Sequence, residues 1–188
     1  MAPPTAHLIA GDGDFPGSAL PALIYKGAVD LPRRDPPSGF ETLFARHGWS
    51  GSWRNGLYTF HHYHSTAHEV LGVSGGIVHM QLGGERGVTV DLEVGDVVVI
   101  PAGVAHKNVA ASGDFRVVGA YPIGTSPDLC FGKPGERPAV DRNIARLGVP
   151  DDPVGGPAGV AHKNVAASGD FRVVGAYPIG TSPDLCFG

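Results

Sequence analysis

Four of the nine histidines in this 188-residue chain lie within eight positions, in the segment HHYHSTAH from His61 to His68. Imidazole is a common ligand of divalent metals, and it is also the side chain whose charge changes near neutral pH. The cluster can therefore mark a metal site, a protonation switch or a chance grouping. Which rings can act together depends on the backbone, and the run LYTFHHYH over residues 57–64 has the composition of a strand.

Alternation along a strand divides this run into two faces. One face carries Tyr58, Phe60, His62 and His64, and the other carries Leu57, Thr59, His61 and Tyr63. Because Tyr58 and Phe60 are large and largely apolar, we predict that their face is interior and that both rings fill the barrel, with contact to a substrate as the alternative. His62 and His64 then point inward, where an unpartnered imidazole is costly and a divalent metal would satisfy it. His61 is predicted to lie at the surface or at an interface.

Glu69 begins the next apolar run, EVLGV, after the turn STAH. It shares a face with Leu71 and Val73, so we expect it to point inward, where a carboxylate needs a cation. Three metal ligands thus converge, and a further inward ligand would complete the site. His68 is expected in the turn, where it is either exposed to solvent or in contact with the metal ligands from outside. If the turn were one residue tighter, His68 could replace Glu69 as a ligand.

The remaining apolar runs are short, and Gly-rich turns separate them. They are IVHMQL, VTVDL, DVVVI, HKNVA and FRVVGAY. This pattern of short apolar runs and Gly-rich turns predicts an all-β sandwich or barrel. Both faces of DVVVI are apolar, so it needs cover from the barrel interior and from the N-terminal arm or a partner subunit. In IVHMQL, His79 and Gln81 share a face that lines the cavity or faces water.

Residues 1–50 are expected to form an arm with a short edge strand within 19–27, followed by a helix over 37–49. Ser38 is the predicted N-cap of that helix and Gly48 its end. Residues 51–132 are predicted to form the barrel, and 133–156 a polar tail with one helical turn. Arg54 and Arg116 are expected to be ordinary surface residues.

Residues 157–188 repeat residues 101–132 exactly. Solenoid repeats drift in sequence and need more copies to form a core, so this duplicate indicates a recent duplication or an error in sequence assembly. The second copy lacks the strand DVVVI in front of it. We therefore predict that it is a non-functional C-terminal appendage and that His162, the counterpart of His106, binds no metal.

Composition argues against several classes of partner. The net charge is −4 and Lys and Arg form no run, which disfavours nucleic acid and anionic membranes. No apolar run could span a bilayer and the first residues do not resemble a signal peptide, so a cytoplasmic location is the expectation. Cys130 and Cys186 occupy equivalent places in the repeat and are expected to be reduced thiols.

Two motifs carry a resemblance to a known family. From Gly56 to Gly76 the spacing is Gly, five residues, His, one, His, four, Glu, six, Gly. From Gly95 to His106 it is Gly, five, Pro, one, Gly, two, His, and eighteen residues separate the two motifs. This pattern resembles the two motifs of the cupin superfamily. The sequence before and after the motifs resembles small bacterial cupins of unassigned function.

The resemblance implies an all-β, RmlC-like jelly-roll barrel whose metal ligands are His62, His64, Glu69 and His106. The metal would be Fe²⁺, Mn²⁺, Ni²⁺, Co²⁺ or Zn²⁺, with coordination positions left open for a substrate. The family often has an asparagine four residues after the second-motif histidine, but here that position is Ala110. Asn108, two residues after His106 and on the same face, is expected to serve as the inward polar partner instead.

The resemblance leaves several functions open. The first is a metal-dependent enzyme of dioxygenase or isomerase/epimerase type, acting on a small polar molecule. The second is a non-catalytic cupin that binds a small ligand or senses a metal, and the third is a metal-free structural barrel. A homodimer is the expectation at the level of the family.

Overall fold

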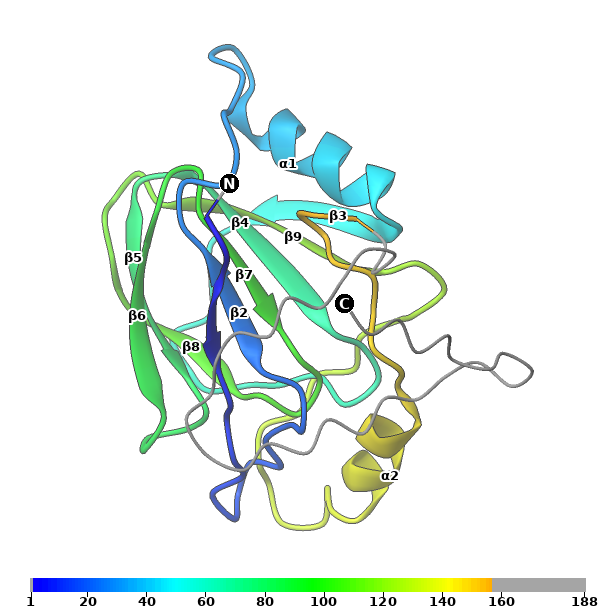
Figure 1. Cartoon of the computed structure of the whole chain (residues 1–188). Helices are drawn as coiled ribbons and strands as arrows, with labels where there is room; N and C mark the ends of the chain where they lie inside the picture. Colours follow the sequence, from blue (N-terminus) through cyan, green and yellow to red (C-terminus); the bar gives the residue numbers. More distant parts are fainter. Residues whose placement is uncertain (1, 157–188) are drawn as a thin grey trace, which may run out of the picture. The chain divides into compact units, whose positions relative to one another are not determined.

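A computed structural model describes residues 2–156 of the chain, and its elements are drawn in Figure 1. Residue 1 and the duplicated segment 157–188 lie outside the described residues, so the predictions for His162 and Cys186 are not addressed by it. The strands are β1 (Thr5–His7), β2 (Ala22–Tyr25), β3 (Trp49–Asn55), β4 (Glu69–Gly75), β5 (Ile77–Leu82), β6 (Val88–Glu93), β7 (Val97–Ile100), β8 (His106–Ala111) and β9 (Arg116–Pro122). The helices are α1 (Pro36–Arg46) and α2 (Ala139–Arg146).

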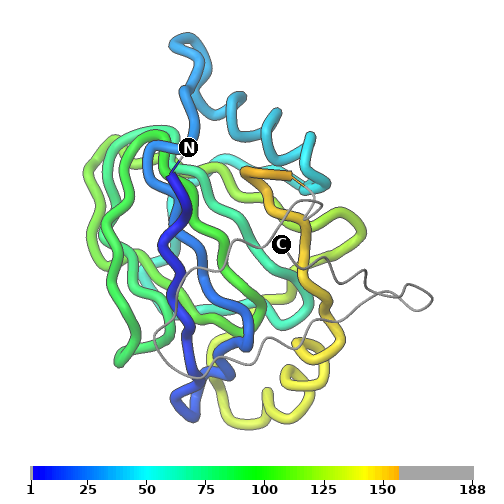
Figure 2. The backbone as a smooth tube through the Cα atoms, viewed as in Figure 1, coloured from blue at the N-terminus to red at the C-terminus, as the bar shows by residue number. Residues whose placement is uncertain are grey.

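The strands form two antiparallel sheets, as expected of a jelly roll. The six-stranded sheet has the order β1-β2-β7-β4-β9-β3, and the three-stranded sheet has the order β6-β5-β8. Figure 2 shows the chain passing repeatedly between them. Leu71 and Ile100 of the larger sheet pack in one apolar cluster with Met80 and Leu82 of the smaller sheet. The predicted all-β fold with a short N-terminal helix is confirmed.

The central strands β4 and β7 are buried on both faces, as the run DVVVI predicts. Val98 and Ile100 face the core between the sheets, whereas Val97 and Val99 face a second apolar cluster. Phe40 of α1 belongs to this second cluster. The N-terminal region, including helix α1, therefore provides much of the outer cover, as one of the two predicted alternatives has it.

Helix α1 lies on the outer face because Phe40 and Phe44 are fully buried there. The predicted N-cap is wrong: Asp35 occupies that position, and Ser38 lies inside the first turn, where its hydroxyl donates to the carbonyl of Asp35. Two consecutive prolines, Pro36 and Pro37, start the helix three residues earlier than the predicted N-cap implies, since proline is suited to the first helical positions. Gly48 follows the helix with a positive φ of 78°, as predicted for a terminating glycine.

The regions flanking the predicted barrel are more integrated than the sequence suggests. The run around β2 is not an edge strand, because β2 pairs with β1 on one side and with β7 on the other. Residues 133–156 do contain the predicted helix, α2, but they are not simply a polar tail. Trp49 donates a 2.9 Å hydrogen bond to the carbonyl of Asp151, and Val154 is buried in the outer cluster. These contacts join residues 133–156 to the sheet.

Glu136 ties this C-terminal region to the segment that carries the histidines. Its carboxylate accepts hydrogen bonds from the Tyr63 hydroxyl at 2.7 Å and from the backbone N–H of Phe131 and Gly132 at 2.9 Å. Burial raises the pKa of Glu136, but the hydrogen bonds outweigh burial and the pKa is lowered below its ordinary value of 4.5.

Because the folded-state pKa of Glu136 is depressed, its stabilising contribution is present above pH 4.5 and is lost as the pH falls through the folded-state value. We expect Glu136→Gln to lower the free energy of unfolding by roughly 1.5 kcal/mol at pH 7 and to flatten its pH dependence below about pH 4.5. Urea unfolding at pH 7 and at lower pH measures both effects. Glu93→Gln, at an exposed position, is the control; an equal loss there would contradict the prediction.

Within the described residues, no helix has both the length and the apolar character needed to cross a membrane. Cys130 is buried and forms no disulfide with any of the described residues, and burial is the main reason that its pKa is raised to about 12. A protonated, inert thiol agrees with the predicted structural role.

Candidate metal centre

The histidine segment is not the continuous strand that its composition predicts. Within residues 2–156, the segment 57–64 makes two isolated bridges and no strand, one bridge from His62 to His106 and one from Tyr63 to Cys130. His62 and His106 exchange backbone hydrogen bonds of 3.2 Å and 2.9 Å, so the segment is tied to the first residue of β8. The chain is extended here without belonging to a sheet, because its partners are a strand end and a loop.

Strand alternation along this segment predicts the burial of His62 and His64 correctly, but its prediction that Tyr58 and Phe60 are buried is wrong. His62 and His64 are buried and face the same space. Tyr58 and Phe60, predicted to fill the core, are about half exposed, whereas Tyr63 is fully buried on the opposite side. Residues 56–61 belong to no strand and make no bridge within the described chain, so no neighbouring strand covers the Tyr58 and Phe60 side chains.

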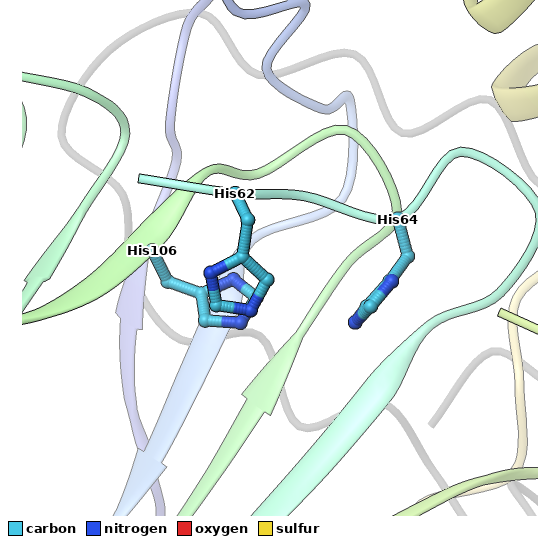
Figure 3. A group of neighbouring side chains, drawn as sticks. All are labelled: His62, His64 and His106. Carbon is cyan, nitrogen blue, oxygen red and sulfur yellow. The ribbon is translucent and has the colours of Figure 1, made fainter. Parts of the chain in front are cut away.

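Three histidine rings meet in this space (Figure 3). The nitrogens of His62, His64 and His106 that could bind a metal all lie within 4.8 Å of one another. The ring centroids of His62 and His106 are 4.1 Å apart, and that of His64 lies 5.8 Å from the first and 6.0 Å from the second. The structure thus unites the three predicted histidines from two separate segments of the chain.

Each of the three rings presents the same nitrogen to the centre. The Nδ1 of His62 faces the carbonyl of Phe60 at 3.3 Å, and that of His106 faces the carbonyl of Val104 at 3.2 Å. The Nδ1 of His64 faces the carbonyl of Asp128. A carbonyl can only accept, so each Nδ1 carries the proton and each Nε2 is left with a lone pair. Such outer hydrogen bonds orient metal-binding imidazoles in known metal sites.

Glu69, at the start of β4, is buried and completes the predicted quartet. Its Oε1 lies 3.6 Å from Nε2 of His64, and its Oε2 lies 3.1 Å from Nε2 of His106. Within the described residues, neither Oε2 of Glu69 nor Nε2 of His106 has a hydrogen-bond partner. Two buried acceptors at this distance need a cation between them, either a proton or a metal ion, so the residues fit a divalent metal.

The electrostatics of the metal-free centre follow from burial and from the carboxylate. Burial, assisted by the neighbouring His106, lowers the pKa of His62 to about 3. Burial also opposes charge on His64, but Glu69 and the carbonyl of Asp128 outweigh it and raise its pKa. Burial raises the pKa of Glu69, whereas His106 and His64 lower it more strongly, so the carboxylate is ionised. The centre thus places three imidazoles around one buried negative charge.

The other histidines of the cluster have different environments. His68 is buried rather than exposed: its Nδ1 accepts the backbone N–H of Ala102 at 3.0 Å, and its Nε2 donates to the carbonyl of Gly148 at 3.0 Å. Both ring nitrogens are therefore occupied away from the centre. The side chain of His61 is only 8% exposed, which corrects the surface prediction, because Phe15 of the N-terminal region packs against it.

Two further sequence predictions concern the smaller sheet. His79 faces water and contacts Asp91 at 2.5 Å, and Gln81 on the same face donates to the carbonyl of Glu85, so neither lines the cavity. Asn108 is not among the residues that line the cavity, and its Oδ1 is buried without a hydrogen-bond partner within the described residues. The expectation that Asn108 serves the centre as an inward partner is not met.

A cavity of about 270 Å³ opens from the centre. Besides the quartet, its lining residues are Trp53, Asn55, Gly56, Leu57, Tyr58, Tyr121, Pro127, Asp128 and Leu129. Trp53 donates a 3.0 Å hydrogen bond to the hydroxyl of Tyr121. Burial, followed by the charge of Glu69, raises the pKa of Tyr121, so this phenol stays protonated. A second hollow contains Arg54 and Arg116 but none of the quartet, and Arg54 is paired with Asp35 and Glu41.

Trp53, Tyr121 and Asp128 belong to the site but are not identified by the sequence reasoning. They lie outside both motifs, on β3, at the end of β9 and in the following loop. Only Gly119 signals this arrangement, since a Cβ there would lie 2.2 Å from the Trp53 ring. The tryptophan reaches the cavity edge because its neighbour on β9 has no side chain.

The chain matches no established protein-family profile. It is 41% identical over 152 residues to the uncharacterized protein YjlB of Bacillus subtilis, and the match covers 80% of this chain and 89% of YjlB. A likeness of this extent shows common family membership, and it extends well beyond the two motifs.

Solved structures give more distant likenesses. Acireductone dioxygenase from Bacillus anthracis, determined with cadmium in its active centre, is 18% identical over 48% of this chain and 62% of that one, with a TM-score of 0.36. An 11S allergen from Cocos nucifera is 20% identical over 68% of this chain and 35% of that one, with a TM-score of 0.38. The chain spans less than two thirds of each of these proteins.

Proposed function

We propose that this chain, which belongs to the cupin superfamily and to the same family as Bacillus subtilis YjlB, holds one divalent transition-metal ion in the centre described above. The ligands would be the Nε2 atoms of His62, His64 and His106 and the carboxylate of Glu69. One observation carries the proposal: three buried imidazoles, each with its Nδ1 facing a backbone carbonyl, turn their lone pairs toward a buried carboxylate. Nitrogen and oxygen donors of this kind suit Fe²⁺, Mn²⁺, Ni²⁺, Co²⁺ or Zn²⁺.

The cavity supports a role in binding a small molecule beside that metal. A bound metal would supply Lewis-acid chemistry or a site for dioxygen at its open positions. The protonated hydroxyl of Tyr121 can donate to an oxygen of the ligand. No lysine or arginine lines the cavity among the described residues, and its two acids are Glu69 and Asp128. A ligand with at most one negative charge at its metal-binding end fits this environment.

Among metal-dependent enzymes, the surroundings favour a dioxygenase type over an isomerase or epimerase type. Proton transfer between carbon atoms needs a free base near the substrate. Asp128 is occupied, because it accepts hydrogen bonds from the backbone N–H and the hydroxyl of Ser65 and from the N–H of Thr66. If Glu69 binds the metal, no uncommitted carboxylate lines the cavity within the described residues. Chemistry centred on the metal itself then fits best.

The role of Glu69 provides the test. If it is a ligand, Glu69→Gln should weaken Zn²⁺ or Fe²⁺ binding by roughly 100-fold or more, exceeding the effect of losing an outer hydrogen-bond partner. Competition titration with a metal-chelating dye measures the affinity, and Glu85→Gln, which changes an exposed carboxylate, is the control. Unchanged affinity in Glu69→Gln would show that Glu69 is not a ligand and would instead support a proton-accepting role.

Catalysis is tested separately by oxygen uptake. The Fe²⁺-loaded protein should consume oxygen with at least one member of a panel of diketones, thiols and enols, and this uptake should be absent from His64→Ala. Binding of panel members without oxygen uptake or product would support the alternative, a non-catalytic cupin that binds a small ligand or senses a metal.

A further inference from the structure

The mouth of the cavity carries a group of exposed apolar side chains, which we call the aromatic rim. It consists of Tyr58, Phe60, Leu129 and Phe131, whose exposed fractions are 53%, 46%, 45% and 36%. Tyr58 and Leu129 also line the cavity, so the rim continues directly from its wall. Large apolar residues gathered in this way at an opening often mark a binding surface.

Two rings of the rim, Tyr58 and Phe60, stand beside His62 of the centre, and Phe131 continues from them. Tyr58 stands edge-on to His62, with centroids 5.0 Å apart and an interplanar angle of 85°. Phe60 stacks on Tyr58 at 4.7 Å and 21°, and Phe131 lies 5.9 Å beyond Phe60. Lys133 places its ammonium 4.8 Å from the Phe131 centroid, at the far end of the rim. A flat group leaving the centre would therefore pass along aromatic surface before it reaches a cation.

The size of the cavity indicates what the rim contacts. At about 270 Å³ it is below the usual range of roughly 300–1,000 Å³ for small-molecule pockets. A ligand that is larger than this cavity and whose oxygen atoms reach the histidines would extend through the mouth, past Tyr58 and Leu129. Its outer part would lie against Tyr58 and Phe60, away from the acidic groups Glu69 and Asp128.

We propose that the aromatic rim binds a planar aromatic part of the ligand, whose oxygen-bearing end reaches the centre formed by His62, His64 and His106. This inference rests on the proposed function, since it assumes a metal-bound ligand. Tyr58 and Phe60 are then specificity-determining residues: they select an aryl-bearing ligand over an equally chelating ligand without a ring. Aromatic contacts of this kind support a preference of about tenfold.

The experiment compares two probes that chelate metal identically. Acetohydroxamate and benzohydroxamate both bind through two oxygens as monoanions, and only the second has a phenyl ring. Calorimetric titration of the Zn²⁺-loaded full chain should show about tenfold tighter binding of benzohydroxamate. Zinc is used because it is redox-inactive, so no oxygen chemistry interferes. Metal content is measured first, and a wild-type chain that holds no metal would overturn the proposed function and this inference with it.

Variants assign the preference to the rim. The ratio of the two probe affinities, measured for each variant at its own zinc content, should fall about threefold in Phe60→Ala and to nearly one in the double variant Tyr58→Ala/Phe60→Ala. Tyr58→Phe, which keeps the ring, should retain the preference. An unchanged preference in the double variant would overturn the inference, as would an equal loss for both probes. A change from dimer to monomer with the preference intact would instead assign the rim to a second copy of the chain.

Discussion

His106→Ala is expected to reduce the bound metal from about one ion per chain to background, with an affinity loss larger than the roughly 10–100-fold typical of outer-shell changes. The change removes one of three converging imidazoles and leaves the carboxylate of Glu69 without its nearest partner, 3.1 Å away. Elemental analysis of protein purified after loading with Zn²⁺ or Fe²⁺ measures the result. His79→Ala is the first control, because that ring faces water on the smaller sheet and should leave metal content unchanged.

The exact repeat provides a second and more stringent control. His162 has the same local sequence as His106, from the preceding Pro-Ala-Gly-Val-Ala to the following Lys-Asn-Val. Only the first copy follows the strand β7 that pairs with β4, on which Glu69 lies. His162→Ala should therefore keep full metal content. If His162→Ala lost the metal and His106→Ala kept it, the second copy would be the one that completes the centre.

Phe40→Ala is expected to destabilise the protein by about 3–5 kcal/mol, a large part of the 5–15 kcal/mol typical of a whole domain. Phe40 is fully buried, and its ring lies against Gly72 of β4, where an added Cβ would approach to 2.4 Å. Truncation would open a cavity over the strand that begins with Glu69. Urea unfolding monitored by circular dichroism, in the presence of a chelator so that metal binding does not contribute, gives the free energy.

Phe60→Ala is the matched control, because it deletes the same ring from a position that is 46% exposed. We expect a change within about 0.5 kcal/mol there, as for most surface substitutions. A loss of unfolding free energy in Phe40→Ala as small as the one expected for Phe60→Ala would mean that the outer apolar cluster contributes far less than its burial indicates. A stable Phe60→Ala protein is also what the probe experiments at the aromatic rim require.

Strand alternation predicted the orientation of His62 and His64 correctly because that orientation depends only on the local backbone. His62 and His64 are two residues apart, so an extended backbone brings them to one side whether or not a sheet forms. Tyr58 and Phe60 share that side, yet they are exposed, because burial depends on which other segment covers them. His68 was predicted in the turn, which is correct, but only the distant partners Ala102 and Gly148 explain why it is buried.

From the sequence, apolar runs between Gly-rich turns predicted an all-β sandwich or barrel, and strand alternation placed His62, His64 and Glu69 on one interior side. The jelly roll and the fourth residue of the centre, His106, were implied by the resemblance of the two motifs to the cupin superfamily. The tertiary structure alone decided what surrounds them. The carbonyl of Asp128 that orients His64, the Trp53–Tyr121 pair at the cavity wall and the solvent-facing rim come from segments far apart in the chain. Their meeting depends on how the sheets and loops pack, and no local spacing encodes it.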